Sequence, residues 1–417
     1  MKKLIKNTTF AILGLGGRGS VYAHFIRESA RNIVAVCDPD ERKREKACAY
    51  GVSPERFYAD ENEFFSQGKL ADVLVIATLD GLHYRQAIKA LDLGYDLLLE
   101  KPIALTLEEC LGIEKKANAL GRTVLVCHVL RYSPFYSRLK ELLDEKVCGE
   151  IVSVSMVEEI GYYHYAHSYV RGNWRNEEIS APLILAKNCH DLDMICWLIG
   201  KDCEYISSFG DLRYFKNEKA PVGATAYCFE CPHKTKCPYS AFHIYHNKEY
   251  ERLAGLAKHG KLGNTFDEIE KSLHDKSNLY ARCVYHSDND VCDHQVATMQ
   301  FNGGVLAQFQ STAFSETMSR SLVIYCENGK IYGEDSGTIR YQRLGEEEQV
   351  IQIKFEDGGY ANHSGGDAAI IRYLLDYMEK GVKAKQITDI SGSILSHKLG
   401  FLAEKSRKDG GKTLRVE

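Results

Sequence analysis

The first third of the chain alternates short apolar runs with longer segments of helical periodicity. The apolar runs have the length of buried strands and lie at residues 8–13, 33–37, 73–77, 95–99 and 123–129. The helical segments between them lie at residues 17–29, 40–50, 83–93 and 107–120. This alternation predicts an α/β fold that begins with a parallel sheet of the Rossmann type, flanked by helices.

After residue 150 the pattern changes to alternating apolar and polar positions. Residues 151–159, 296–301, 306–310 and 322–326 have the period of two that is typical of half-buried strands. Gly303-Gly304 predicts a hairpin between two of these strands. We therefore expect a first domain over residues 1–130 and a second α/β domain over 131–417, with a cysteine-rich insert at about 225–295.

A glycine-rich loop lies between the first apolar run and the first helical segment. It reads Gly14-Leu15-Gly16-Gly17-Arg18-Gly19. In this context Gly14 allows a tight turn, Gly16 lets the backbone approach a pyrophosphate, and Gly19 permits close packing of helix and strand. The sequence therefore predicts a dinucleotide on the helix N-terminus, with Gly14, Gly16, Gly17, Arg18 and Gly19 around it.

An acidic residue ends the second strand at the distance expected for a ribose contact. The carboxylate of Asp38 can accept hydrogen bonds from both ribose hydroxyls and repels a 2′-phosphate, which favours NAD over NADP. Arg42 and Lys43 oppose this preference, since they can neutralise a phosphate.

Composition narrows the class of protein. The 417 residues carry a net charge of −4, so nothing in the charge balance indicates nucleic acid as a partner. No apolar run approaches the roughly 20 residues of a membrane helix. The N-terminus carries no secretion signal, and fourteen cysteines without one indicate reduced thiols and a cytoplasmic enzyme.

Several polar residues follow the predicted parallel strands. Thr78 and His83 come after the third strong run, Glu100 and Lys101 after the next, and His128 lies at the last. Since ligands of open α/β sheets lie outside the carboxyl ends of the strands, we expect one site here. Thr78, His83, Glu100 and Lys101 complete the predicted cofactor contacts.

With these residues the chain resembles the glucose–fructose oxidoreductase/inositol dehydrogenase (Gfo/Idh/MocA) family. The motifs that carry the resemblance are the glycine loop, Asp38, Glu100-Lys101-Pro102, His128 to Pro134, Gly149-Glu-Ile, His190-Asp-Leu-Asp193 and His363-Ser-Gly-Gly-Asp367. The resemblance implies a second domain with an open, mostly antiparallel sheet, a homodimer or homotetramer, and hydride transfer between a secondary hydroxyl of a sugar, polyol or glycoside and NAD.

The resemblance also implies the catalytic residues. Lys101 would lie beside the developing alkoxide, or act as base if burial lowers its pKa, and His190 is the other acid/base position. Family members often have an aspartate four residues before this histidine, where this chain has Ala186. We interpret the adjacent Lys187 as a second active-site cation near the substrate or Asp193, with a surface lysine as the alternative.

Residues 161–175 form a segment that is dense in aromatic rings and hydrogen-bond donors. Because sugars stack on aromatic rings and their hydroxyls need polar partners, this segment predicts a sugar pocket. The candidates are Tyr163, His164, His167 and Trp174, with Arg171 or Arg175 for an anionic group. An exposed loop anchored by Trp174 is the alternative. Asp193 and His363 complete the substrate set, whereas Asp367 belongs to the same motif or caps the helix 368–380.

The cysteines at 228, 231 and 237 have the spacing C-x2-C-x5-C, and Cys283 follows later. Thiolates this close repel one another unless a cation holds them, so we expect structural zinc on Cys228, Cys231, Cys237 and Cys283. His233 and Cys292 are alternative fourth ligands. An iron–sulfur cluster and free thiols are the alternatives to zinc.

Three functions are compatible with this sequence. We favour an NAD-dependent sugar or polyol dehydrogenase that releases NADH. A redox-neutral enzyme that cleaves glycosides by transient oxidation is the alternative, and a non-catalytic sensor of NAD or a sugar is less favoured because Lys101 and His190 are both present.

Overall fold

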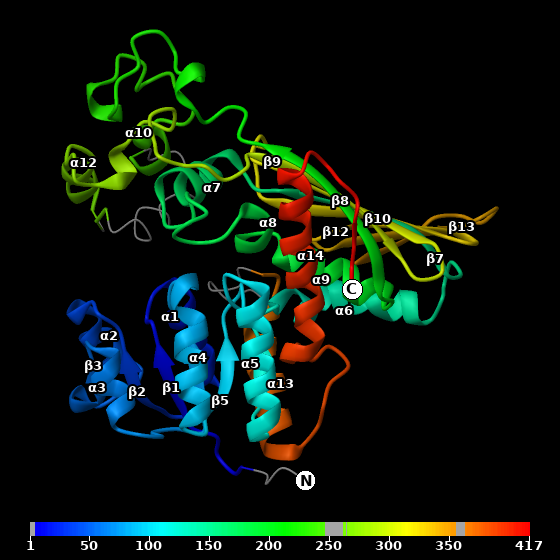
Figure 1. Cartoon of the computed structure of the whole chain (residues 1–417), viewed down its shortest axis with the longest axis horizontal. Coiled ribbons are helices and arrows are strands. Elements are labelled where there is room, and N and C mark those ends of the chain that lie inside the picture. The colour runs from blue at the N-terminus through cyan, green and yellow to red at the C-terminus, as the bar shows by residue number, and fades with distance from the viewer. Residues whose placement is uncertain (1–4, 247–261, 264, 356–362) are drawn as a thin grey trace. The chain divides into compact units, whose positions relative to one another are not determined.

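A computed structural model describes residues 5–246, 262–263, 265–355 and 363–417. Its first sheet is parallel, with the strand order β3-β2-β1-β4-β5-β6 (Figure 1). The strands are β1 (Phe10–Leu13), β2 (Ile33–Cys37), β3 (Phe57–Tyr58), β4 (Val73–Ile76), β5 (Asp96–Leu99) and β6 (Val124–Val126). The predicted Rossmann sheet is therefore confirmed.

Alternate residues of these strands pack into two different cores, because successive side chains of a strand point to opposite faces. Phe10 and Ile12 face one core, together with residues of α1 (Gly17–Glu28) and α13 (Gly366–Leu375). Ala11 and Leu13 face the other. That second core is closed by α3 (Glu61–Ser66), α4 (His83–Asp92) and α5 (Leu107–Leu120). Helices on both faces are what a fully buried parallel sheet requires.

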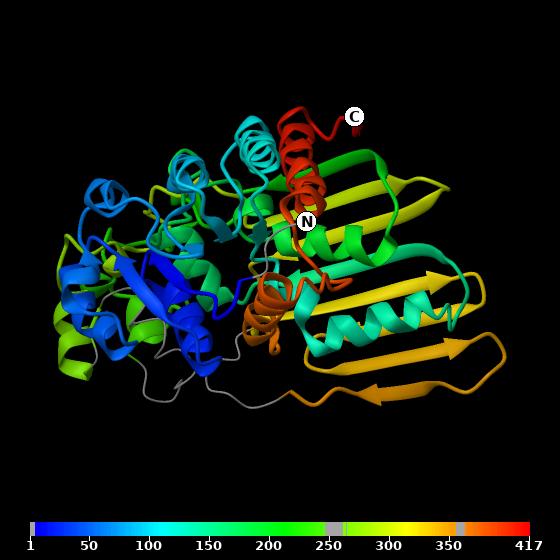
Figure 2. The same cartoon turned by 90° about the horizontal axis from the view of Figure 1, so that it is seen from below.

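The second sheet is larger and open. Its strand order is β14-β13-β12-β11-β7-β10-β9-β8-β15. Figure 2 shows its strands from below. The strands are β7 (Ile151–Glu159), β8 (Cys203–Asp211), β9 (His294–Phe301), β10 (Val305–Thr312), β11 (Ser319–Cys326), β12 (Gly329–Glu334), β13 (Thr338–Arg343), β14 (Gln349–Gln352) and β15 (Leu414–Arg415). The predicted hairpin at Gly303-Gly304 joins β9 to β10, and both glycines have positive φ.

By internal contacts the described chain divides into two compact units. The first comprises residues 1–153, 189–202 and 323–401, and the second comprises residues 154–188, 203–322 and 402–417. The expected boundary at residue 130 stays a prediction. The remaining helices are α2 (Arg44–Ala49), α6 (Pro134–Asp144), α7 (Tyr162–Tyr165), α8 (Leu183–Ala186), α9 (Cys189–Ile199), α10 (Ala241–Tyr245), α12 (Phe266–Leu273) and α14 (Ile390–Lys408).

Some predicted elements differ at their ends. The segment 40–50 begins as a short 3₁₀ turn, Glu41–Lys43, before α2. The last parallel strand is shorter than predicted, because the chain turns into a 3₁₀ helix at Val129–Tyr132. Residues 246–271 of the cysteine-rich insert are mostly charged and helical in character. Most of them lie outside the described residues, and α12 overlaps the part that is described. None of the described helices combines the length and apolarity that a membrane span requires.

Candidate active site

The glycine loop has the geometry that its sequence predicts. Gly14 has a φ of +85°, and a Cβ there would lie 2.6 Å from the carbonyl oxygen of Ala77. At Gly19 a Cβ would lie 1.9 Å from the carbonyl oxygen of Gly14, so helix and strand approach too closely for a side chain. A Cβ at Gly16 would meet no atom within 4 Å. Gly16 also precedes the first turn of α1, so the loop fits a pyrophosphate.

The carboxylate of Asp38 is buried beside this loop. Its Oδ2 accepts hydrogen bonds from the Leu15 N–H (2.7 Å) and from Nζ of Lys43 (2.8 Å). Arg42 instead pairs with Asp40, and its side chain is largely exposed. The Oδ1 of Asp38 accepts from the Asp40 N–H (3.0 Å). Asp38 is thus fixed against the glycine loop by two backbone donors and one cation, in a place suited to a ribose.

Arg18 connects the glycine loop to two other segments. Its Nε donates to Glu100 (2.7 Å), and its Nη2 donates to Asp367 (2.6 Å). The Tyr22 hydroxyl donates to Glu100 as well (2.6 Å). Burial opposes ionisation, but the charges of Arg18 and Lys101 hold the pKa of Glu100 below its usual value. Glu100 is therefore a carboxylate that anchors the loop containing Lys101.

Lys101 follows β5 and is half-buried. Its backbone N–H donates to the Glu100 carboxylate (3.0 Å), and the peptide bond to Pro102 is cis. Two other predicted cofactor residues contact protein groups. The Thr78 hydroxyl donates to Gln86 (2.6 Å), and the buried ring of His83 lies 2.8 Å from the Pro102 carbonyl oxygen through Nδ1.

Three histidine rings of the first unit lie next to one another in space. His128, after β6, lies 5.7 Å from His190 of α9, and His190 lies 5.8 Å from His363, between ring centroids. The Nδ1 of His363 lies 3.0 Å from an oxygen of Asp367. Burial, followed by the charges of Arg131 and Lys101, lowers the pKa of His128, so this ring is neutral.

Asp367 is not the helix cap that one interpretation of the sequence suggested. Gly365 occupies the N-cap of α13, and Asp367 lies inside the first turn, where its carboxylate binds Arg18 and His363. These two partners hold its pKa below the usual value in spite of burial.

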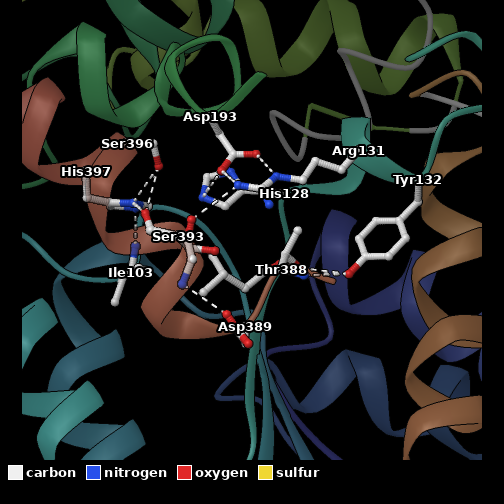
Figure 3. Close-up of polar contacts among 12 residues, drawn as sticks. Ile103, His128, Arg131, Tyr132, Asp193, Thr388, Asp389, Ser393, Ser396 and His397 are labelled. Carbon is white, nitrogen blue, oxygen red and sulfur yellow. Dashed lines mark hydrogen bonds and ion pairs between the residues drawn. The ribbon is translucent and has the colours of Figure 1, made fainter. Parts of the chain in front are cut away.

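Asp193, predicted as a substrate residue, forms a buried ion pair. Arg131 donates to its two oxygens over 2.7 and 2.6 Å (Figure 3). Burial raises the pKa of Asp193 even though Arg131 opposes the shift. The sequence analysis did not assign Arg131 a role, and only its place in the motif after β6 could have indicated one.

Lys187 lies in the second unit, where it has found an anion. Its Nζ lies 2.9 Å from Glu158, which is almost fully buried and also pairs with Arg320. Glu158 is the eighth residue of β7 and shares a face with the buried Val154 and Met156, so the alternation along the strand turns its carboxylate inward. The Lys187 ammonium is thus balanced by a carboxylate within its own unit.

The aromatic segment of the second unit is only partly buried. Tyr163, His164 and Trp174 are half-buried, which leaves part of each ring accessible. His167 is buried, with its ring stacked on Tyr280 at 4.7 Å. Its Nδ1 lies 2.9 Å from the Tyr245 hydroxyl.

The two arginines of this segment, Arg171 and Arg175, already have protein partners. Arg175 forms two hydrogen bonds with Asp288 (2.9 and 3.1 Å). Arg171 is fully buried and donates to the carbonyl oxygens of Arg282 and Tyr239 (both 2.7 Å). Among the predicted sugar contacts Tyr163, His164, His167 and Trp174, the buried residue is His167, whose ring stacks on Tyr280.

The four cysteines predicted as zinc ligands line one small cavity of about 20 Å³ in the second unit. An isolated bridge between Tyr227 and Arg282 brings the two cysteine segments together. However, within the described ranges no group of three or more His, Cys, Asp or Glu is placed to hold a metal ion. Structural zinc is therefore not supported by this arrangement.

Comparison with known families identifies both halves of the chain. Residues 8–128 match the model of the Gfo/Idh/MocA N-terminal domain, described as an oxidoreductase family with an NAD-binding Rossmann fold. Residues 140–380 match the C-terminal α/β domain of the same family.

Curated relatives are similar at about a quarter of aligned positions. The "Putative oxidoreductase YteT" of Bacillus subtilis is 27% identical over 73% of this chain and 72% of its own length. An inositol 2-dehydrogenase/D-chiro-inositol 3-dehydrogenase of Lactiplantibacillus plantarum is 27% identical over 51% of this chain. That match spans 59% of the relative's own length, somewhat over half.

Solved structures share the fold over nearly the whole chain. An inositol dehydrogenase homologue from Azotobacter vinelandii, complexed with NAD+, has a TM-score of 0.69 at 16% identity and covers 100% of this chain and 99% of its own. An oxidoreductase from Agrobacterium radiobacter has a TM-score of 0.70 at 14% identity and covers 98% of both chains. On the two family models, which together span most of its length, the chain belongs to the Gfo/Idh/MocA family of NAD-binding oxidoreductases.

Proposed function

We propose that this oxidoreductase is an NAD-dependent dehydrogenase that transfers a hydride between a secondary hydroxyl of a sugar, polyol or glycoside and the nicotinamide. The observation that carries the proposal is the grouping within the first unit. Lys101 follows β5, and Gly16 leaves open space at the start of α1. His190 adjoins the histidine that follows β6, and His363 adjoins His190. The relatives named as inositol dehydrogenases support the substrate class.

Oxidation of a secondary alcohol breaks one C–H and one O–H bond. When bound, NAD+ supplies the acceptor for the hydride, which leaves with the electron pair of the C–H bond. The hydroxyl proton passes to a base and a ketone remains. We assign proton transfer to His190 and stabilisation of the developing alkoxide to the ammonium of Lys101. His363, held by Asp367, is proposed to bind the substrate.

The cofactor contacts are part of the same proposal. The backbone at Gly14, Gly16, Gly17 and Gly19 would hold the pyrophosphate, and Asp38 the adenosine ribose. Arg18 would act mainly by fixing Glu100 and Asp367, since both carboxylates bind its guanidinium. Asp38 pairs with Lys43 through Oδ2 and accepts from the Asp40 N–H through Oδ1, and its negative charge is proposed to favour NAD over NADP.

The remaining substrate assignments lie in the second unit. Tyr163, His164 and Trp174 are proposed to contact the sugar, because their rings are partly accessible. His167 and Arg175 would support them, since both already bind protein groups. Lys187 is proposed to contribute a positive charge near the substrate while its ammonium remains paired with Glu158.

For the cysteine cluster we propose zinc bound to Cys228, Cys231, Cys237 and Cys283, with an iron–sulfur cluster as the alternative. The support is that all four side chains line one cavity and that Arg171 donates to Cys228 Sγ over 3.7 Å. Binding would require the thiolates to draw together around the metal. Elemental analysis of the purified protein tests this: one zinc per chain, lost in C231S, supports it, and protein that stays metal-free after growth in zinc contradicts it.

The wider setting is also proposed. None of the fourteen cysteines forms a disulfide, which suits a reducing, cytoplasmic compartment. A homodimer or homotetramer is the expected assembly, to be measured by light scattering.

The proposed reaction is tested by NADH absorbance when the protein meets NAD+ and a panel of inositols, free sugars and glycosides. Growth of NADH with one substrate class supports the dehydrogenase. The comparisons do not favour the redox-neutral alternative; glycoside cleavage without net NADH would nevertheless establish it, and absence of any turnover would indicate a sensor.

A further inference from the structure

The loop that carries Lys101 is held by hydrogen bonds at consecutive residues. The Lys101 N–H donates to Glu100 (3.0 Å), and the Pro102 carbonyl oxygen lies 2.8 Å from Nδ1 of His83. The Ile103 N–H donates to Nε2 of His397 over 2.9 Å. Both histidine rings are fully buried. The backbone around Lys101 is therefore fixed before, at and after the cis peptide.

His397 comes from a distant part of the chain. It lies on α14, 294 residues after Ile103, and its ring reaches back to the end of the parallel sheet (Figure 3). It lies within a long helix, and no motif in the sequence around it indicates a role. It belongs to the first unit, as do Lys101 and His190.

The hydrogen bonds of His397 determine its tautomer. A backbone N–H can only donate, so Nε2 must accept from Ile103 and carry no proton. The proton then lies on Nδ1, which is 3.0 Å from the Ser393 carbonyl oxygen and can donate to it. Burial lowers the pKa of His397 to about 3, so the ring stays neutral. Both nitrogens are thus used, and the ring has a single orientation.

The same ring adjoins the proton-transfer group. The ring centroid of His397 lies 5.4 Å from that of His128, and the ring centroid of His128 lies 5.7 Å from that of His190. The charges facing His397 are those of Asp193, which favours its protonation, and of Lys101, which opposes it. A shift of the His397 ring would therefore disturb both the Lys101 loop and the packing that leads to His190.

We propose that His397 is a positioning residue, which acts together with His83 to fix the Lys101 ammonium where the substrate hydroxyl reacts. The inference rests on the proposed function, since it assigns His397 a part in that reaction. Misplacing a reacting group by about 1 Å can reduce turnover by about 10²-fold. Loss of the bond to Ile103 would allow such a displacement, because among the described residues the acceptor for that N–H is His397.

Three variants of His397 test the proposal, with one control. H397L removes the hydrogen-bond acceptor. H397N has an amide oxygen on a side chain that is too short to reach the position of Nε2, and H397Q retains an oxygen at about that position. L399A on the same helix creates a cavity at a fully buried position that has no bond to the loop. We expect kcat to fall about 10- to 100-fold in H397L and H397N with KM little changed, and H397Q to recover most of it. L399A lowers Tm without this loss of kcat.

Equal slowing in H397L and L399A, or no recovery in H397Q, would overturn the proposal. A readout without turnover separates it from the proposed reaction. Reductive methylation with ¹³C labels the lysine amines, and the Lys101 signal is the one missing in K101R. Its chemical shift and titration should change in H397L and stay near wild type in H397Q and L399A. An unchanged signal in H397L would overturn the proposal even if the protein oxidises none of the sugars tested.

Discussion

At the scale of single residues, the two lysines predicted for the active site have different charged neighbours. Lys101 lies beside the carboxylate of Glu100, which is itself bound by Arg18 and Tyr22. Lys187 instead shares the buried Glu158 with Arg320. Lys187 lies in an otherwise apolar stretch of the sequence, where its ammonium needs an anion or a pocket. The anion is Glu158, which lies 29 residues before Lys187 on β7, and residue patterns do not reveal this tertiary contact.

Replacement of Lys101 by methionine should lower kcat by about 10² to 10⁴-fold, because a group that stabilises or transfers charge in the reaction is lost. NAD binding and Tm should stay near wild type, since the side chain is half-buried and the loop is fixed by its backbone. Steady-state kinetics and calorimetry measure both. A K101M enzyme with normal kcat would remove Lys101 from the mechanism.

Replacement of Glu158 by glutamine should destabilise the protein by about 3–5 kcal/mol, because two buried cations lose their shared carboxylate. The neighbouring E159Q is the matched control, with an expected loss of about 1 kcal/mol or less. Urea unfolding followed by tryptophan fluorescence compares the two variants. Equal midpoints for E158Q and E159Q would contradict the assigned burial of this charge cluster.

At the scale of elements, local sequence was sufficient wherever a strand or helix is determined by its own side chains. The strand Ile33–Cys37 and the helix Leu107–Leu120 have the predicted bounds, because apolar periodicity and the Thr106 cap define them locally. The glycine loop was also predictable, since each glycine answers a steric need. The bonds of His397 and Asp367 were not, because they join segments hundreds of residues apart.

The glycines separate folding from cofactor binding. G19A should lower Tm strongly, since its Cβ would lie 1.9 Å from a backbone oxygen that cannot move away. G16A should leave Tm near wild type, because its Cβ meets no protein atom, yet weaken NAD binding at least 10-fold by occupying the pyrophosphate space. Calorimetric titration with NAD+ measures the affinity. Unchanged affinity in G16A would contradict the assigned cofactor site.

At the scale of the whole molecule, the buried neutral histidines make stability depend on pH. The fold lowers the pKa of His128 and that of His397, the latter to about 3. In the unfolded chain each ring takes up a proton below about pH 6.5, while the folded form stays neutral. Stability is therefore complete above pH 6.5 and is lost as the pH falls, approaching about 1.4 kcal/mol per pH unit for each ring.

The variant H397Q removes one of these two protons. Between about pH 6.5 and 5 its unfolding free energy should therefore depend on pH less steeply than that of wild type, by up to about 1.4 kcal/mol per pH unit. Urea midpoints at several pH values provide the slopes. Parallel slopes in the two proteins would show that His397 is protonated in the folded state.

The central claim is that this member of the Gfo/Idh/MocA family oxidises a sugar or polyol with net reduction of NAD+. The most direct measurement is the ratio of NADH formed to ketone formed in one reaction mixture, by absorbance and mass spectrometry. We predict a ratio of one, with both products formed about 10² to 10⁴-fold more slowly in K101M. Product formation from a glycoside without NADH, at a rate that depends on bound NAD+, would contradict the account.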